Sequence, residues 1–231
     1  MGKIIKIDGK KKGNQNTNMY KEKMEKIIKC YTVESGKGRK EYCIADAIQI
    51  ADEILDIYSK ESFAATPIVR IIKDFGFLIY NSDLDKLNEN GVSGIIEVNG
   101  QTKDIYSNDK IIVTNCNDPN EHQRFVAAHE LGHYIMHCLG DSKYLDKNIL
   151  FKETYVYNSH QDKKEKCADQ FAAQLLMPKK KFVYRYAKAV QDFNGERERV
   201  IKYLSDYFQV KKESVEKRVK EILLEECYEW G

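Results

Sequence analysis

The sequence predicts an α+β protein in which a small antiparallel sheet packs on one long helix, with additional helices towards the C-terminus. Three observations lead to this fold class. Apolar residues recur at helical spacing over residues 44–59, three short segments between residues 76 and 114 are rich in Ile, Val, Phe and Tyr, and helical periodicity returns beyond residue 118. Strands and helices are therefore segregated along the chain, which is typical of α+β folds.

Composition limits the class of protein further. The chain has 231 residues, of which 42% are hydrophobic, so it can bury a core and is not wholly disordered. The 38 Lys and Arg against 36 Asp and Glu leave a net charge of +2, which argues against a wholly basic nucleic-acid binder. No segment approaches the ~20 apolar residues of a membrane span, and residues 1–13 lack a signal-peptide core. We therefore expect a cytoplasmic protein with no membrane association.

Positive charge is concentrated near the N-terminus. Residues 1–40 hold 12 Lys and Arg and 4 Asp and Glu, a net charge of +8, whereas the other residues hold 26 and 32, a net charge of −6. We interpret residues 1–43 as a basic N-terminal extension, which is either a solvated tail or an arm for nucleic acid or an acidic partner. If it is a tail, deleting residues 1–40 should leave the fold intact.

The cysteines favour a reducing compartment. None of the six forms a C-x-x-C pair, and their spacing is wide, so we expect reduced thiols and neither a disulfide framework nor a zinc ribbon. They are Cys30, Cys43, Cys116, Cys138, Cys167 and Cys227.

The first half of the folded part contains two helices and then the sheet. One amphipathic helix runs from Ile44 to about Ser59, and a second starts near Pro67, a favoured first-turn residue. Short β-rich segments follow, and Asn99-Gly100 predicts a two-residue hairpin turn because both residues tolerate positive φ. The predicted strands are Gly76–Tyr80, Gly94–Val98 and Lys110–Thr114.

Helices make up the second half. Asp118 and Pro119 supply capping signals for a long helix, and a second helix runs from about Asp162 to Met177, where Pro178 ends it. Further helices are predicted over residues 179–191, 196–208 and 212–226. We expect a catalytic domain over residues 44–180 and a C-terminal helical region over residues 181–231.

The sequence His129-Glu-Leu-Gly-His133 carries the chemistry. Residues four apart share one helix face about 6 Å apart along the axis, so both imidazoles can bind one metal ion. Glu130 lies beside that ion, where a carboxylate can take a proton from the attacking water and pass it to the leaving amine. Gly132, in the middle of the helix, suggests that another backbone or a ligand comes close.

A third metal ligand must come from elsewhere in the fold. The second long helix offers Glu165, Cys167 and Asp169. Glu165 and Asp169 share a face, which can place one carboxylate on the metal and the next behind a ligating histidine. Glu165 could instead cap its helix, whereas Cys167 points about 200° away and is expected to be a small core residue.

The other histidines are weaker candidates. His137 lies about 12 Å along the axis from His129, so one ion cannot bind both together with His133. We expect His137 to lie behind the ligands or at the surface. A donor to the transition state could come from His122, His160, Tyr155 or Tyr157, and the sequence does not choose among them.

Two segments resemble the ImmA/IrrE family of metallopeptidases. They are QRFVAAHELGH, which ends at His133, and EKCADQFAAQLLMP, which starts at Glu165. The resemblance implies one Zn²⁺ bound by His129, His133 and Glu165, with Glu130 as the catalytic base, although other divalent ions suit the same donors. Many members have Glu-Ala-Asn where this chain has Cys167-Ala-Asp169, and Asp169 should still support a ligand.

The resemblance also implies a function. Members are similar in being cytosolic, selective endopeptidases that cut regulators such as repressors, so we expect a protein substrate of this kind and a role in transcription regulation. Its backbone should pair with an edge strand of the sheet, for which Ile111–Asn115 is the best candidate. The alternative is a non-catalytic, metal-bound regulator that binds a protein or DNA partner.

The C-terminal helices leave nucleic-acid binding open. Residues 200–219 faintly resemble a helix-turn-helix, but glutamates are interspersed among the basic residues, and these would repel a phosphate backbone. We expect these helices to form a subdomain packed beside the catalytic core.

Overall fold

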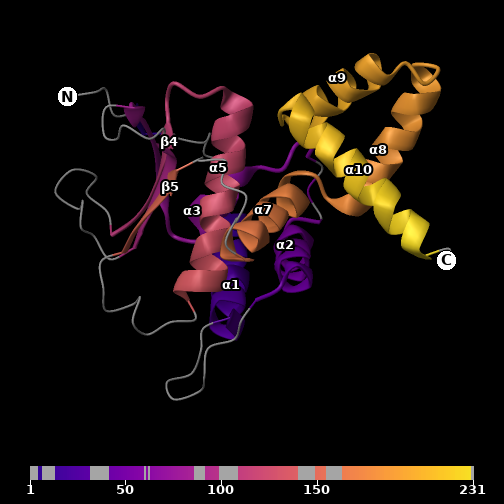
Figure 1. The fold of residues 1–231 in the computed structure, drawn as a ribbon. Helices are drawn as coiled ribbons and strands as arrows, with labels where there is room; N and C mark the ends of the chain where they lie inside the picture. The colour runs from indigo at the N-terminus through magenta and orange to yellow at the C-terminus, as the bar shows by residue number, and fades with distance from the viewer. Residues whose placement is uncertain are drawn as a thin grey trace.

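The computed structural model describes residues 5–6, 14–31, 42–59, 61, 63–85, 92–98, 109–139, 149–154 and 163–229. A five-stranded sheet forms one layer, and helix α5 (Asn120–His133) runs beside it. Helices α7 (Lys163–Leu176) and α2 (Ile44–Ile57) lie on the far side of α5 (Figure 1). The α+β class is therefore confirmed, with the His-Glu-x-x-His sequence at the end of the helix beside the sheet.

The sheet has the strand order β1-β2-β4-β3-β5. Its inner strands β4 and β3 are antiparallel, with Ile112 opposite Ile96, and β5 pairs antiparallel with β3. The strands span Ile5–Lys6 (β1), Leu78–Ser82 (β2), Val92–Val98 (β3), Lys110–Asn115 (β4) and Ile149–Thr154 (β5). The three strands predicted from the sequence are therefore present, whereas the Asn99-Gly100 turn lies outside the described residues.

Two expectations about the sheet are corrected. It is mixed, not antiparallel, because β4 inserts between β2 and β3 and pairs parallel with β2. Ile111–Asn115 is consequently an inner strand whose two edges are both occupied, so it cannot receive a substrate strand. Strand periodicity shows which residues form a strand but not where that strand lies in the sheet.

Helices α2 and α5 are buried to different extents. One face of α2 is buried, through Ala47, Ile50, Ala51 and Ile54 at helical spacing, and packs against α7. Helix α5 is buried all round from Val126 to His133 because the sheet lies on one side and α7 on the other. It starts after Pro119, without a side-chain cap from Asp118, and continues as a π-helix, η2 (Tyr134–Cys138).

Helix α1 (Asn14–Tyr31) corrects the expectation of a solvated N-terminal tail. Its residues Tyr20, Met24 and Ile27 are buried in the main core, and the Tyr20 ring stacks on Tyr58 at 4.9 Å. Lysines between these positions make the segment basic overall, but the three buried residues recur at helical spacing and form an apolar stripe on one face of α1. Deletion of residues 1–40 should therefore destabilise the fold. The domain limits at residues 43 and 180 stay predictions.

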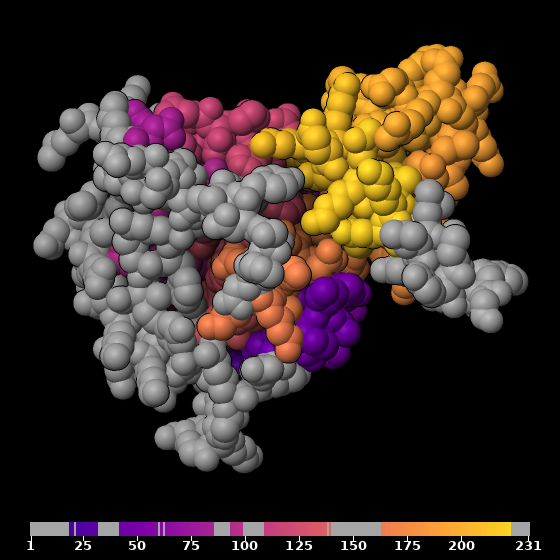
Figure 2. Space-filling view, viewed as in Figure 1, coloured from indigo at the N-terminus to yellow at the C-terminus, as the bar shows by residue number. Residues whose placement is uncertain are grey.

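The C-terminal helices form a lobe beside this core, which we call the α8–α10 unit. It consists of α8 (Lys179–Asp192), α9 (Arg197–Phe208) and α10 (Lys212–Glu229), close to the predicted ranges. Helix α9 packs on both α8 and α10. In the space-filling view the unit protrudes from the molecule, with α10 in yellow beside α7 in orange (Figure 2).

Two smaller expectations concern membranes and thiols. Over the part of the chain that the structure describes, none of the helices is long and apolar enough to cross a membrane. Cys30, Cys43, Cys116 and Cys167 are free thiols, as expected from their spacing.

Candidate metal centre

The sheet fixes one side of the site. Helix α5 passes so close to β3 that a Cβ on Gly94 would lie 2.3 Å from Cγ1 of Val126 and 3.0 Å from Oε1 of Glu130. Only glycine allows this approach without a shift of one element. Glu130, which is fully buried, is therefore held beneath the strand β3.

A second close approach fixes the other side. A Cβ on Gly132 would lie 2.9 Å from Cδ1 of Phe171 and 3.4 Å from Cα of Ala168, so α5 and α7 cross at this glycine. The sequence-based interpretation of Gly132 as a point of close approach is confirmed. The crossing lets a side chain from the first turns of α7 reach the histidines of α5.

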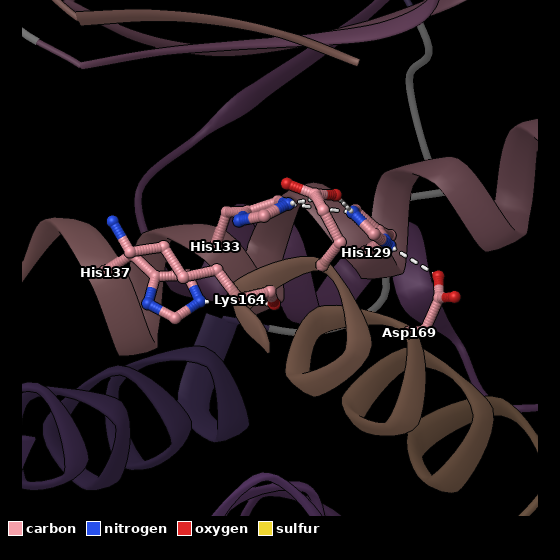
Figure 3. Close-up of polar contacts among 6 residues, drawn as sticks. His129, His133, His137, Lys164 and Asp169 are labelled. Carbon is pink, nitrogen blue, oxygen red and sulfur yellow. Dashed lines mark hydrogen bonds and ion pairs between the residues drawn. The ribbon is translucent and has the colours of Figure 1, made fainter. Parts of the chain in front are cut away.

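Three side-chain atoms converge at the crossing. The Nε2 atoms of His129 and His133 lie 2.8 Å apart, and Oε2 of Glu165 lies 3.2 Å from each of them. Both histidines are buried, whereas the Glu165 side chain is 37% exposed, so the group opens to solvent on the α7 side. Figure 3 shows the rings of His129 and His133 directed towards one another from the same helix.

Asp169 stands behind His129. Its Oδ1 lies 3.0 Å from Nδ1 of His129 (Figure 3), whereas Glu165 contacts the other ring nitrogen, Nε2. In a metal-bound site, a proton on Nδ1 donated to Asp169 would leave the Nε2 lone pair of His129 to bind the ion. Glu165 and Asp169, four residues apart on α7, thus contact the two ring nitrogens of the same imidazole, that of His129.

The electrostatics keep Glu165 ionised. Partial burial acts to raise its pKa, but hydrogen bonds to His129 and His133 outweigh that effect and hold the pKa of Glu165 well below its usual range. An ionised carboxylate and two imidazole nitrogens, all aimed at one point, are donors that a divalent metal ion accepts.

The size of the group also fits a metal ion. Its three ligand atoms lie within 4.8 Å of one another. Four donors at 2.0–2.1 Å in a tetrahedron are about 3.3 Å apart, close to the 2.8–3.2 Å seen among these three atoms. The residues present therefore fit a metal centre with at least one position left for water or substrate.

Other candidates lie away from this point. Cys167 is buried with its Sγ directed at the carbonyl of Tyr42, 3.5 Å away, as expected for a core residue. His137 is also buried, so the surface alternative for it is wrong; its Nε2 lies 3.4 Å from the carbonyl of Lys164. His122 lies near Asp118 at the start of α5, 3.8 Å from its carboxylate. His160, Tyr155 and Tyr157 lie outside the described residues.

Two residues that position α5 are not apparent from the sequence pattern. Gly94 is predicted only as the start of a strand, although a glycine inside a strand pattern can indicate close backbone approach. Arg124, one and a half turns before His129, donates hydrogen bonds to the carbonyls of Thr66 and Gln209. Nothing in the local pattern around Arg124 predicts those partners, which are 58 and 85 residues away.

A His-Glu-x-x-His helix, crossed by a second helix that brings a carboxylate to both histidines, is the arrangement of a metallopeptidase. A family model agrees with it: Peptidase M78, described as the IrrE N-terminal-like domain, matches residues 72–220, and the chain belongs to this family. A comparison with curated proteins finds no significant match. The matched range runs from α3 (Ile68–Asp74) into α10, so it includes most of the α8–α10 unit.

Proposed function

We propose that the protein is a zinc-dependent endopeptidase that cleaves a specific regulatory protein in the cytoplasm. The observation that carries this proposal is the convergence of His129, His133 and Glu165 at one point, with Glu130 next to His129 on the same helix. Membership of a metallopeptidase family supports the same conclusion.

The metal ligands in this proposal are Nε2 of His129, Nε2 of His133 and Oε2 of Glu165. When bound, zinc would lower the pKa of a coordinated water towards about 7 and polarise the scissile carbonyl. Asp169 would hold the His129 ring in the required orientation and tautomer. The same donors accept other divalent ions, so zinc is inferred from the family and the donor set together.

Glu130 is the proposed general base. It follows His129 directly on α5, and its Oε1 lies beneath β3, 3.0 Å from where a Cβ on Gly94 would stand. From there it would accept a proton from the attacking water and deliver it to the leaving amine. Full burial beneath β3 limits its side-chain rotation, which would keep the carboxylate in place during both transfers.

Substrate backbone is proposed to bind at β5. This strand is at one end of the sheet, and among the described residues it pairs only with β3, so its outer edge is the one to which an extended peptide would add. β5 replaces Ile111–Asn115, whose edges are occupied, in this role. A repressor-like regulator is the proposed substrate, because such proteins are the targets that the family resemblance implies.

The test uses Glu130→Gln, which preserves shape but cannot accept a proton at neutral pH. We expect about one zinc per chain by elemental analysis and no cleavage. The protein substrate need not be known, since mass spectrometry can identify new peptide N-termini in a cell lysate incubated with each variant. Glu121→Gln, an exposed position in the first turn of the same helix, is the matched control and should cleave normally.

Two outcomes would contradict the proposal. If wild-type protein holds zinc but produces no N-termini beyond those of Glu130→Gln, the alternative of a non-catalytic metal-bound regulator for a protein or DNA partner gains support. If Glu130→Gln cleaves as wild type does, another residue is the base.

A further inference from the structure

Two arginines attach the α8–α10 unit to the two helices that carry the metal ligands. We propose that one of them, Arg218 on α10, is a positioning residue for the metal centre, holding α7 so that Glu165 and Asp169 reach the histidines of α5. This inference rests on the proposed metal centre. It assigns the α8–α10 unit a part in building that centre, instead of the role of an independent module.

The contacts of Arg218 are directed at α7. The residue is only 4% exposed, and its Nη2 donates to Oε1 of Gln174 and to the carbonyl of Met177, the latter at 3.3 Å. Its Nη1 lies 3.4 Å from Oε2 of Glu221, one turn further along α10. Oε1 of Glu221 in turn accepts a hydrogen bond from Gln170, at 3.2 Å. Arg218 and Glu221 thus bind two glutamines that are one turn apart on α7.

Those glutamines lie opposite the metal ligand. At about 100° per residue, Gln170 and Gln174 are about 140° and 180° around the α7 axis from Glu165, whereas Asp169 is only about 40° away. Helix α10 therefore supports α7 from behind while the front of α7 faces α5. A small rotation or shift of α7 would carry Glu165 and Asp169 away from His129 together, because both are on one rigid helix.

Gln174 extends the hydrogen bonds of Arg218 to a third helix, α2. Gln174, itself buried, donates through Nε2 to Oδ1 of Asp52 on α2 at 2.7 Å. The hydrogen-bonded chain from Arg218 through Gln174 to Asp52 connects α10, α7 and α2. Because Gln174 uses its acceptor towards Arg218 and its donor towards Asp52, its amide orientation is fixed by both neighbours.

A second attachment acts on α5. Arg124 donates from Nε to the carbonyl of Gln209, in the turn between α9 and α10, at 3.2 Å, and from Nη2 to the carbonyl of Thr66 at 2.9 Å. The hydroxyl of Thr66 donates to the carbonyl of Leu175 on α7 at 2.7 Å. The unit is therefore connected to both ligand-bearing helices, and Arg218, together with Glu221, connects it to α7, which supplies the carboxylates.

The experiment measures metal binding, which needs no substrate. Arg218→Met keeps the buried alkyl chain and removes the guanidinium. We expect its Zn²⁺ affinity, measured by competition with a chromophoric chelator, to fall about 10-fold, the lower end of the range for residues that support ligands. The visible absorption of bound Co²⁺ should also change, because the position of Glu165 relative to the ion changes.

The control is Arg197→Met. Arg197 also bonds a glutamate of α10, Glu216 at 2.8 Å, but its side chain is 69% exposed and it contacts neither α7 nor α5 in the described contacts. Its Zn²⁺ affinity and Co²⁺ spectrum should equal those of wild type. If Arg218→Met does not fold, Arg218→Lys, which keeps the charge but not the branched donors, should show a smaller loss of the same kind.

A thermodynamic cycle separates positioning from general stability. In a Glu165→Ala background, where His129 and His133 still bind Zn²⁺ weakly, Arg218→Met should weaken that binding by less than about 3-fold, because the metal ligand that Arg218 positions is gone. Equal losses in both backgrounds would overturn the inference and indicate an effect on the whole fold. Unchanged affinity in Arg218→Met would overturn it while leaving the peptidase proposal standing, whereas no zinc binding by wild-type protein would overturn both.

Discussion

The α5–α7 crossing and the α8–α10 unit are both helix packings, but they are built from different residues. At the crossing, Gly132 meets Ala168 and Phe171, and the backbones approach until a methyl group has no room. In the α8–α10 unit, large rings fill the contacts, with Phe182 stacked on Phe208 at 5.4 Å and the guanidinium of Arg185 4.4 Å from the centroid of the Tyr207 ring. Small residues at the crossing fix a short distance between the axes of α5 and α7, whereas rings and flexible cationic side chains let the helices of the α8–α10 unit shift relative to one another.

The difference follows from what each region must hold. Three ligand atoms from two helices must meet within about 3 Å of one another, so an ångström of freedom between α5 and α7 would separate them. The α8–α10 unit carries none of these atoms. It needs precision where Arg218 and Arg124 connect it to α7 and α5.

The largest expected effect is at the ligand itself. Glu165→Ala should weaken zinc binding severely and abolish cleavage, because it removes the carboxylate that contacts both histidines. Asp169→Ala should weaken zinc binding by about 10–100-fold, and Cys167→Ser should change it little. Elemental analysis and competition titration measure these differences. Stoichiometric zinc in Glu165→Ala, or sulfur at about 2.3 Å from the metal by X-ray absorption, would contradict the ligand assignment.

The next effect tests whether α1 belongs to the rigid part of the molecule. Met24→Ala should lower the free energy of unfolding by about 2–5 kcal/mol, because Met24 is fully buried in the main core. Glu25→Ala, the adjacent exposed position, should change it by less than about 0.5 kcal/mol. Chemical denaturation measures both variants. If Met24→Ala were as stable as wild type, this segment would again be interpreted as a dispensable tail.

Gly94→Ala tests how tightly β3 and α5 are packed. The added methyl would overlap Cγ1 of Val126, so we expect a loss of about 1–3 kcal/mol in the free energy of unfolding. Val126→Ala in the same chain removes that contact and should recover part of the loss, giving a measurable coupling between the two positions. If the losses in the free energy of unfolding from Gly94→Ala and Val126→Ala simply add, the close approach of β3 and α5 does not cause the loss in Gly94→Ala.

The smallest effect is expected on the outer face of the α8–α10 unit. Lys202→Ala removes an exposed ion pair with Asp206 and should cost less than about 1 kcal/mol while leaving zinc affinity unchanged. Thermal unfolding and zinc titration check this. A loss of zinc affinity here would show that the whole unit, and not only its contacts through Arg218 and Arg124, determines the geometry of the metal centre.

Much of the fold was predictable because its signals are local. The apolar spacing of α2, the β-rich segments of the sheet and the proline that ends α7 each depend on neighbours within a few residues, and each element was found near its predicted place. Helix α1 is not predicted because its lysines and glutamates outnumber the residues of its buried stripe. The composition of the segment therefore indicates a solvated tail, although the spacing of its apolar residues is that of a helix with one buried face.

The sequence by itself determined which side chains are the candidates for the metal centre. The four-residue spacing of His129 and His133 places both imidazoles on one face of any helix that they form, and the same spacing links Glu165 with Asp169. The tertiary structure decided where β4 lies in the sheet, how closely Gly94 and Gly132 let their neighbours approach, and which distant groups Arg124 and Arg218 bind. Helical spacing is a property of neighbouring residues, whereas these contacts join segments tens of residues apart and depend on packing that no local pattern encodes.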